Sequence, residues 1–313
     1  MSEEAGLTMS KRDSIDVGGR VRTYTVVDPP GATDQRDLLL VFHGSKQDGP
    51  RHRAFTGHLY DTLAEQHATV VVYLDGYRGN WNDARRASRF PARTEDIDDV
   101  GFTRAVIERL AGSHGVDRKR VFAVGYSNGG QMVMRLLHEV PELIAGATVI
   151  GATMPEPDNF LLPATVPAAV PVLLIHGTKD PIVPYQGGEL SWWARRLFKV
   201  GGRSLSMPAT AAYFATHSGI TAAAVTDARP VSSAARTWVE RTAHRQEGHP
   251  PVALYTVHGG GHTVPGPHPA PFVLGRTHRD LDTADLIAEF FGLGRERPAH
   301  PDLPAAGVCS RPV

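Results

Sequence analysis

Residues 121–130 read Val-Phe-Ala-Val-Gly-Tyr-Ser-Asn-Gly-Gly, an apolar run followed at once by a glycine-rich turn. The turn has the pattern Gly-x-Ser-x-Gly with its serine at position 127, and a helical pattern follows over 131–139 until Pro141. A serine on a tight strand-to-helix turn needs small neighbours, because its own backbone is strained and the helix packs close behind it. The stretch therefore predicts a buried strand that presents Ser127 at its carboxyl end as a candidate nucleophile.

Similar apolar runs recur along the chain, separated by patterns typical of helices. The strand candidates are 38–42, 69–74, 121–124, 145–150, 172–175 and 253–257, and the helix candidates are 51–66, 98–111, 131–139 and 284–291. Segments 14–17 and 21–27 flank Gly18 and Gly19, which indicates a hairpin. Apolar runs without alternation, separated by helices, are typical of a parallel sheet covered on both faces. We therefore predict an α/β fold with a mostly parallel central sheet, whose functional residues follow the carboxyl ends of the strands.

We predict a single domain over residues 11–293. The first ten residues and the proline-rich segment 294–313 have little periodic apolar pattern, and both are predicted to be disordered. A loop-rich stretch after Asp180 predicts a short lid-like insertion over about residues 186–206, after the sixth to seventh strand region. The sequence gives no indication of an oligomeric state.

The charge balance argues against two classes of partner. The chain has 33 Lys and Arg against 33 Asp and Glu, and its isoelectric point is about 7.3. Such a chain has no electrostatic reason to coat nucleic acid or an anionic membrane. No apolar stretch approaches the length of a membrane-spanning helix, and the acidic first residues do not resemble a secretory signal, so we expect a cytoplasmic location. With Cys309 as its one cysteine, the chain can form neither an internal disulfide nor a multi-cysteine zinc site.

Small or polar clusters follow four of the predicted strands, at 43–45, 125–129, 176–180 and 258–262. A serine hydroxyl needs a base to remove its proton, and His262 is favoured because it follows a late strand in a glycine-rich loop. Asp180 directly follows the predicted strand 172–175, which makes it the candidate carboxylate that orients this histidine. The chain order Ser127, Asp180, His262 is the order found in α/β hydrolases, so we predict that fold and a nucleophile elbow at Ser127.

Three neighbouring histidines also offer a metal-binding alternative: His258, His262 and His268. Three glycines at 259–261 make the helical His-x-x-x-His geometry unfavourable, and no glutamate lies between the histidines as a zincin motif requires. The sequence therefore predicts neither a metal nor another cofactor.

Two backbone amides are predicted to form an oxyanion hole. One belongs to Asn128, the residue after the nucleophile, and the other to Ser45 in the loop after the strand 38–42. The candidates for substrate binding are three aromatic residues: Trp81, Tyr185 and Trp192. A core position is an equally good interpretation for Trp81. Two arginines at 195–196 could bind a carboxylate-bearing substrate, although a solvated basic face is the more frequent outcome for such a pair.

Several longer motifs occur in one order over about residues 15–292. They are Leu-Val-Phe-His-Gly at 40–44, Tyr-Leu-Asp-Gly at 73–76, Asn-Trp-Asn-Asp at 80–83, Asp-Asp-Val-Gly-Phe at 98–102, Tyr-Ser-Asn-Gly-Gly at 126–130, His-Gly-Thr-Lys-Asp-Pro-Ile-Val-Pro-Tyr at 176–185 and Gly-Gly-Gly-His-Thr-Val-Pro-Gly at 259–266. With these motifs the sequence resembles the polyhydroxybutyrate depolymerase-like (LpqC-like) esterases of the α/β-hydrolase superfamily, a group that includes feruloyl and acetylxylan esterase-like proteins.

The resemblance implies ester hydrolysis through an acyl-enzyme intermediate, with a small-molecule or oligomeric ester as substrate. It places the same roles on Ser127, Asp180 and His262 as the residue patterns do. Two positions depart from the group: Ser45 stands where many secreted relatives have cysteine, and Val264 where many have tryptophan. These departures weaken the case for an extracellular polymer as substrate.

Three other functions stay open at this point. The same triad could transfer the acyl group to an acceptor other than water, as in a transacylase or cyclase. The fold also carries oligopeptide hydrolases, although no additional specificity domain is evident in the sequence. A non-catalytic binding module is the third alternative, and the presence of all three triad members argues against it.

Overall fold

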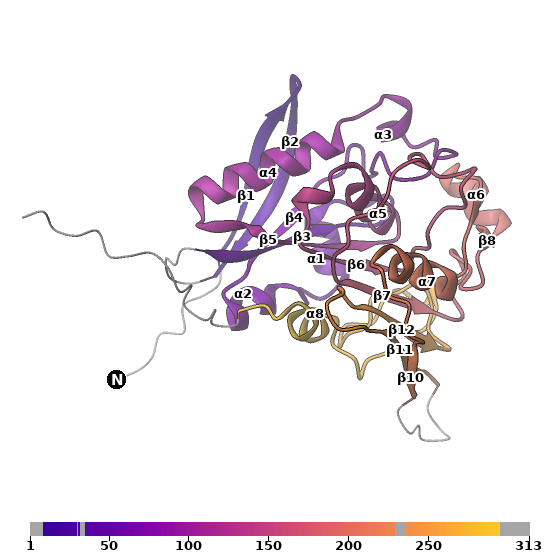
Figure 1. Ribbon diagram of the computed structural model, residues 1–313. Coiled ribbons are helices and arrows are strands. Elements are labelled where there is room, and N and C mark those ends of the chain that lie inside the picture. Colours follow the sequence, from indigo (N-terminus) through magenta and orange to yellow (C-terminus); the bar gives the residue numbers. More distant parts are fainter. Residues whose placement is uncertain (1–8, 30, 32–34, 229–235, 295–313) are drawn as a thin grey trace, which may run out of the picture.

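The computed structural model describes residues 9–29, 31, 35–228 and 236–294. In this part of the chain a ten-stranded sheet has the order β1-β2-β4-β3-β5-β6-β7-β12-β11-β10 (Figure 1). Its centre is parallel and consists of β4 (Val70–Leu74), β3 (Arg36–Phe42), β5 (Val116–Tyr126), β6 (Gly146–Ile150), β7 (Val172–Gly177) and β12 (Val252–His258). Antiparallel strands extend both edges: β1 (Met9–Val17) and β2 (Arg20–Asp28) on one side, β11 (Trp238–His244) and β10 (Val225–Ala228) on the other. The predicted mostly parallel sheet is confirmed.

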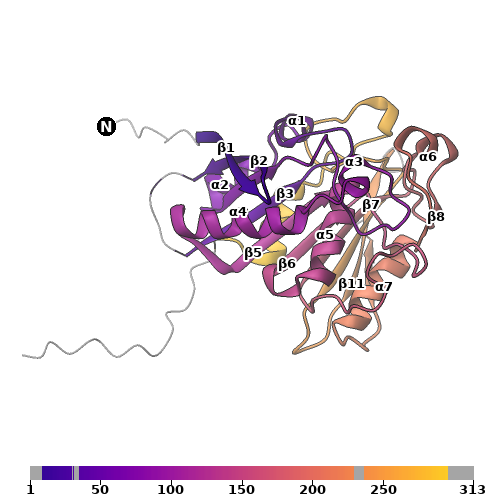
Figure 2. The same cartoon turned by 90° about the horizontal axis from the view of Figure 1, so that it is seen from above.

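Helices cover both faces of the sheet (Figure 2). One face packs against α4 (Asp99–Ser113), α5 (Asn128–Glu139) and α7 (Met207–His217), and the other against α1 (Gly49–Phe55), α2 (Asp61–His67) and α8 (Thr283–Phe291). Successive residues of β3 contribute to the two apolar cores in turn, with Leu38 and Leu40 on one face and Leu39 and Val41 on the other. Burial on both faces explains why the central strands are continuous apolar runs.

Shorter elements lie in the connections. They are α3 (Pro91–Thr94), a 3₁₀ turn at Pro141–Leu143, β8 (Gly188–Glu189), α6 (Trp192–Phe198), β9 (Arg203–Ser204) and a 3₁₀ turn at Phe272–Leu274. The predicted insertion at about 186–206 corresponds to α6 and to the strands on either side of it, β8 and β9, which pair with each other.

Some elements differ from the sequence-based expectation. The predicted helix 51–66 is two helices, because Gly57 and His58 adopt positive φ angles of 64° and 63° and end α1. Strand β1 begins at Met9, inside the segment predicted to be disordered, and pairs with β2. The rest of that segment and residues 295–313 lie outside the described residues. The edge strands β10 and β11 were not expected. Helix α7 was not expected either, and it begins where the Ser206 side chain accepts a hydrogen bond from the Ala209 amide.

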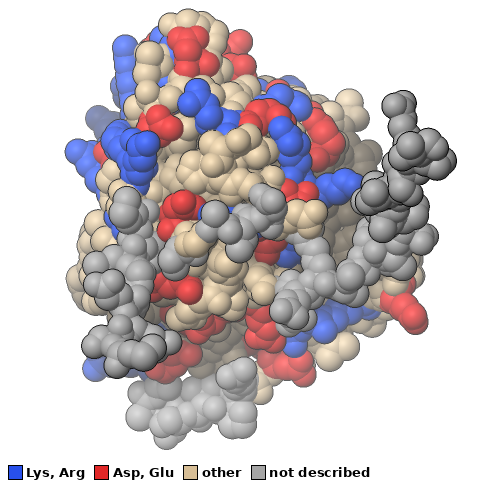
Figure 3. All heavy atoms as spheres, turned by 90° about the vertical axis from the view of Figure 1, so that its left-hand side faces the viewer, with Lys and Arg blue, Asp and Glu red and all other residues tan. Residues whose placement is uncertain are grey.

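The surface carries charges of both signs. On the face seen in Figure 3, positive and negative side chains are interspersed. Exposed ion pairs include Arg104–Glu142 and Arg118–Glu108. Within the described ranges, no helix combines the length and apolarity needed to cross a membrane.

Three buried histidines make the stability of the fold sensitive to acid. Burial lowers the pKa of His43 to about 4, of His52 to about 3 and of His138 to about 4, against an ordinary value of 6.5. Below about pH 6.5 the unfolded chain therefore binds protons that the folded protein excludes. The stabilisation is fully present above that pH, and each histidine reduces it by up to about 1.4 kcal/mol per pH unit as the pH falls toward the folded value.

We therefore expect the melting temperature to fall steadily between about pH 7 and pH 5, before most carboxylates titrate. Scanning calorimetry across that range tests this. His52 stacks with Phe55 and Tyr126, so His52→Phe keeps an aromatic ring there and should make the pH dependence shallower. A melting temperature that is constant over this range would contradict the prediction.

Candidate active site

Ser127 lies on a strained turn between β5 and α5. Its φ and ψ angles are 55° and −115°, a conformation that residues other than glycine rarely adopt. The Ser127 amide donates to the Ile150 carbonyl of β6 at 2.8 Å. No side chain fits at either flanking glycine. A Cβ on Gly129 would lie 2.0 Å from the Phe42 carbonyl oxygen, and a Cβ on Gly125 would lie 2.3 Å from the Gly129 carbonyl oxygen. The predicted strand–turn–helix geometry around Ser127 is therefore present.

His262 and Asp180 form a short, buried hydrogen bond. The distance from His262 Nδ1 to Asp180 Oδ2 is 2.6 Å, although the two residues are 82 positions apart in the sequence. The other carboxylate oxygen, Oδ1, accepts the amides of Ile182 and Val183 at 2.8 Å each. These amides fix the carboxylate at the end of β7, and the carboxylate in turn fixes the orientation of the His262 ring.

A second histidine contacts the same carboxylate. His176 Nε2 lies 3.2 Å from Asp180 Oδ2 and 3.0 Å from the Val183 carbonyl oxygen. Burial alone would raise the pKa of Asp180, but attraction to His262 and hydrogen bonds from His176 and His262 outweigh burial and hold the pKa well below its ordinary value. Asp180 is therefore ionised throughout the neutral range. No sequence pattern assigned a role to His176, although its position four residues before Asp180 was an available signal.

Tyr126 and Gly151 lie against His262 and restrict its backbone and its ring. The Tyr126 hydroxyl donates to the His262 carbonyl oxygen at 2.7 Å, and the two rings lie 5.0 Å apart. A Cβ on Gly151 would lie 3.1 Å from His262 Cε1 and Nδ1, and the φ of Gly151 is +60°. A side chain at position 151 would thus be strained and would press against the imidazole ring.

Ser127 and His262 line one cavity of about 120 Å³. Its wall is largely apolar and includes Phe55, Phe90, Ile182, Val183, Leu190, Phe198, Val200 and Leu274. Three of these residues, Leu190, Phe198 and Val200, come from the insertion around α6. The insertion therefore covers part of the cavity beside the nucleophile candidate.

The two predicted oxyanion donors also line this cavity. Asn128 is the first residue of α5, so its amide has no partner within the helix. In the loop after β3, the Gly44 amide donates to Gln47 Oε1 and the Lys46 amide to the Gly79 carbonyl oxygen. Between them, the Ser45 amide has no acceptor among the described residues. This pattern is compatible with a donor that is kept free for a bound oxyanion.

A buried ionic network supports Asn128 from behind. The Asn128 side chain donates to Asp83 Oδ2 at 2.5 Å and accepts the Trp81 amide at 2.9 Å. Asp83 also binds the Arg85 guanidinium, with distances of 2.5 Å to Nη2 and 3.2 Å to Nε. Arg85 lines the cavity, so this network joins the cavity wall to the start of α5. No sequence pattern indicated this network.

Replacement of Asp83 by alanine should destabilise the protein strongly. The side chain of Asp83 is fully buried and that of Arg85 is 9% exposed, so the variant leaves a buried guanidinium without its carboxylate. Removing one partner of a buried pair costs about 3–5 kcal/mol. Urea unfolding at neutral pH measures the loss, with Glu108→Ala, which breaks the exposed pair with Arg118, as the matched control. A loss of less than about 1 kcal/mol would show that this network does not stabilise the fold.

The three predicted substrate-binding aromatics lie in different surroundings. Trp81 is fully buried, packs edge-on against Phe42 and donates its indole N–H to the His43 carbonyl oxygen at 2.9 Å. It supports the loop of the oxyanion donors and does not line the cavity. Tyr185 hydrogen-bonds Thr256 and packs edge-on against His176, behind the triad candidates. Trp192 is 73% exposed on α6 and lines a separate groove.

The other two histidines of the metal alternative do not join His262. His258 stacks on Trp238 with a ring separation of 3.7 Å, and its Nε2 lies 3.6 Å from Glu240. His268 lies against Gly57. Across the described ranges, no group of three or more His, Cys, Asp or Glu side chains is placed to hold a metal ion.

The chain is similar to known esterases in sequence. A model of the phospholipase/carboxylesterase family matches residues 84–197, a segment that includes Ser127 and Asp180. NocK of Nocardia uniformis subsp. tsuyamanensis, a protein named as an esterase, is 32% identical over 300 residues, which cover 91% of this chain and 83% of NocK. The bifunctional acetylxylan esterase/xylanase XynS20E of Neocallimastix patriciarum is 27% identical over 179 residues, 55% of this chain and 23% of that protein.

Among solved structures, the acetyl xylan esterase from Aspergillus awamori superposes with a TM-score of 0.56 at 17% identity, covering 90% of this chain and 99% of that one. This similarity, with the mostly parallel sheet and the Ser127 turn, shows that the protein has the α/β-hydrolase fold. Because identity to NocK extends over most of both chains, the protein belongs to the same family, the esterases of the phospholipase/carboxylesterase type.

Proposed function

We propose that the protein is a serine esterase that hydrolyses carboxylic esters through an acyl-enzyme on Ser127. His262 acts as general base and then as general acid, and Asp180 orients it and stabilises its charged form. The observation that carries this proposal is the 2.6 Å hydrogen bond between His262 and the ionised Asp180, at a cavity that Ser127 also lines.

In the acylation step the Ser127 oxygen attacks the ester carbonyl carbon while its proton passes to the free ring nitrogen of His262, Nε2. The carbonyl oxygen becomes an oxyanion, which accepts hydrogen bonds from the amides of Ser45 and Asn128. When the intermediate collapses, the carbon–oxygen bond to the alcohol breaks, and His262 returns the proton to the departing alkoxide. The acyl group stays on Ser127.

Deacylation repeats these steps with water as the nucleophile. His262 takes a proton from water as the hydroxide oxygen bonds to the acyl carbon, and the proton then returns to Ser127 as the acid leaves. An alcohol in place of water would give a transesterified product by the same route.

The proposed substrates are small or oligomeric esters, as in the polyhydroxybutyrate depolymerase-like group. The apolar cavity of about 120 Å³ beside Ser127 supports a short acyl or hydroxyacyl group at this position. Two proteins that are similar over part of the chain are named as acetylxylan and feruloyl esterases, which supports ester cleavage without deciding among acyl groups.

A fluorophosphonate probe combined with a substrate panel tests the proposal. The panel consists of p-nitrophenyl esters of increasing chain length together with feruloyl, acetyl-sugar and 3-hydroxybutyrate esters. We expect covalent labelling of Ser127 and hydrolysis of short-chain esters in preference to long ones. An intact protein that is neither labelled nor active on any ester would overturn the proposal, and ester products formed only with added alcohols would favour acyl transfer.

The pH dependence of kcat/KM should reflect the histidine base alone, because Asp180 stays ionised over the range measured. A histidine that acts as general base must be neutral, and histidines ordinarily titrate near pH 6.5, whereas the pKa of Asp180 is held well below this range. Activity should therefore fall as the pH drops, with a single titrating group, between about pH 8 and pH 5. Initial rates at each pH, with return to neutral pH as a control for acid unfolding, measure the profile. A flat profile would exclude a histidine base.

A further inference from the structure

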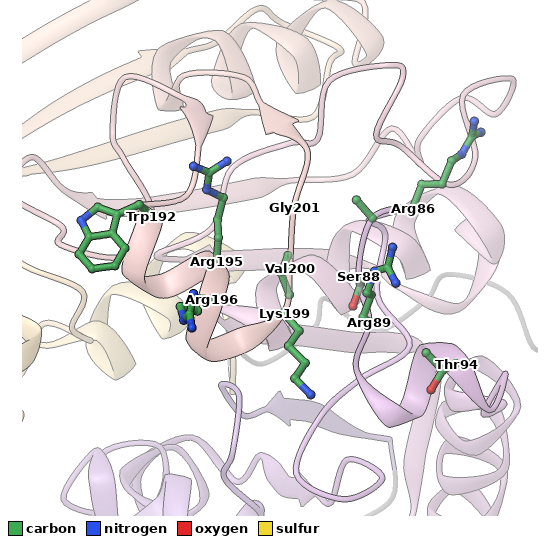
Figure 4. Close-up of a pocket in the computed structure, with 11 residues that line it drawn as sticks. Arg86, Ser88, Arg89, Thr94, Trp192, Arg195, Arg196, Lys199, Val200 and Gly201 are labelled. Carbon is green, nitrogen blue, oxygen red and sulfur yellow. The ribbon is translucent and has the colours of Figure 1, made fainter.

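A wide groove adjoins the cavity of Ser127. It has a volume of about 820 Å³ and lies between helix α6 with the residues that follow it and the segment 86–89, as Figure 4 shows. Val200 lines both the groove and the cavity, and it forms an isolated β-bridge with Ser88, which also lines the groove. Phe198 faces the cavity and the next residue, Lys199, faces the groove. A substrate that extends from Ser127 past Val200 would therefore enter this groove.

The groove is cationic. Five basic residues line it, namely Arg86, Arg89, Arg195, Arg196 and Lys199, and its described lining contains no carboxylate. Arg195 is paired with Glu189 at 2.5 Å. The side chains of the other four have no hydrogen-bond or ion-pair partner in the part of the chain that the structure describes.

This concentration of one sign differs from the charge balance of the chain as a whole and from the face seen in Figure 3. The whole chain has equal numbers of basic and acidic residues, and the face in Figure 3 mixes the two signs. Unpaired like charges in one groove repel each other, and an anion that binds among them removes this repulsion. Guanidinium groups also match the planar, two-oxygen geometry of carboxylate and phosphate.

Trp192 adds an apolar surface to the same groove. Its side chain is 73% exposed on α6, and Figure 4 shows it at the end of the groove opposite Arg86 and Arg89. An exposed indole beside arginines suits a ligand that joins an anionic group to an apolar chain or ring.

We propose that the groove binds an anionic group, a carboxylate or a phosphate, on the part of the ester remote from the bond that is cleaved. The preferred substrates are then acidic esters. This inference rests on the proposed esterase function and specifies the substrate class of the same site.

Matched ester pairs test the proposal in the full-length protein. The p-nitrophenyl monoesters of succinate, adipate and suberate are compared with the p-nitrophenyl esters of the fatty acids of equal length. A second pair, 4-acetoxyphenylacetate and its methyl ester, carries the charge on the alcohol part. The readout is the ratio of kcat/KM for the anionic ester to that for the neutral ester.

The test variant is Arg89→Gln/Arg196→Gln, which removes one unpaired charge from each wall. The matched control is Arg109→Gln/Lys119→Gln, two exposed cations on α4 and β5 that do not line the groove. We expect the ratio to fall on the order of tenfold in the test variant and to stay within about twofold in the control. The wild-type ratio should also decrease between about 20 mM and about 500 mM NaCl, because salt screens exposed charges.

The outcomes separate this inference from the proposed function. An equal ratio in the test variant, control and wild type, for both ester pairs, would overturn the anionic-substrate proposal while leaving the esterase intact. Failure of the wild type to hydrolyse the neutral esters and to react with fluorophosphonate would overturn both. The reversed-charge variant Arg89→Glu/Arg196→Glu provides a second measurement, and it should lower the ratio further than the glutamine variant does.

Discussion

Ser127→Ala should abolish ester hydrolysis and leave the fold intact. The variant lacks the oxygen that forms the acyl-enzyme, and in serine hydrolases loss of the nucleophile lowers kcat by about 10⁶-fold. Alanine adds no volume at the turn, where both neighbouring glycines are confined by backbone oxygens. We therefore expect a stability change within about 0.5 kcal/mol. Single-turnover kinetics and urea unfolding on the same preparation measure the two quantities.

The control is Ser113→Ala, at an exposed position at the end of α4. Its activity should equal that of the wild type. If Ser127→Ala kept activity within tenfold of the wild type and was still labelled by fluorophosphonate, another residue would be the nucleophile. Loss of activity together with loss of the folded state would instead show that the Ser127 hydroxyl is needed for the turn itself.

The sequence predicted the centre of this fold well because the deciding signals there are local. An apolar run, Gly125, Ser127 and Gly129 occur within ten residues, and each is required by the close approach of β5 and α5. The same is true of the hairpin at Gly18 and Gly19. The carboxyl ends of parallel strands lie at the same edge of a sheet. Because Ser127, Asp180 and His262 each follow a predicted strand, the sequence was enough to place them in one region.

The sequence was less informative where contacts join distant segments. Asp83 supports Asn128 from 45 residues away, and nothing in either segment alone shows it. Trp81 has a strand before it and a polar loop around it, a pattern shared by core and pocket residues, so only packing against Phe42 and His43 decides its place. Trp192 was a candidate for substrate binding, and no sequence pattern indicated that α6 places it in the cationic groove and not in the cavity of Ser127.

His262→Ala should be as damaging as Ser127→Ala, and the double variant should be little worse than either single one. The three residues of the triad act as a unit, and either single variant should lower kcat by about 10⁶-fold. Removing a second residue then lowers kcat little further, because the first substitution has already removed the mechanism. Additive losses would mean that the two residues act in separate steps.

The fold should survive this substitution because Asp180 keeps other partners. Loss of the imidazole would leave a buried carboxylate, but His176 Nε2 at 3.2 Å and the amides of Ile182 and Val183 still contact it. We therefore expect an inactive protein with a cooperative unfolding transition. His258→Ala is the matched control, because His258 is the last residue of β12, four positions before His262, yet stacks on Trp238 and does not line the cavity. If the His258 variant were the inactive one and the His262 variant kept its activity, the assignment of the base would be wrong, because the 2.6 Å contact with Asp180 would then serve only to hold the loop.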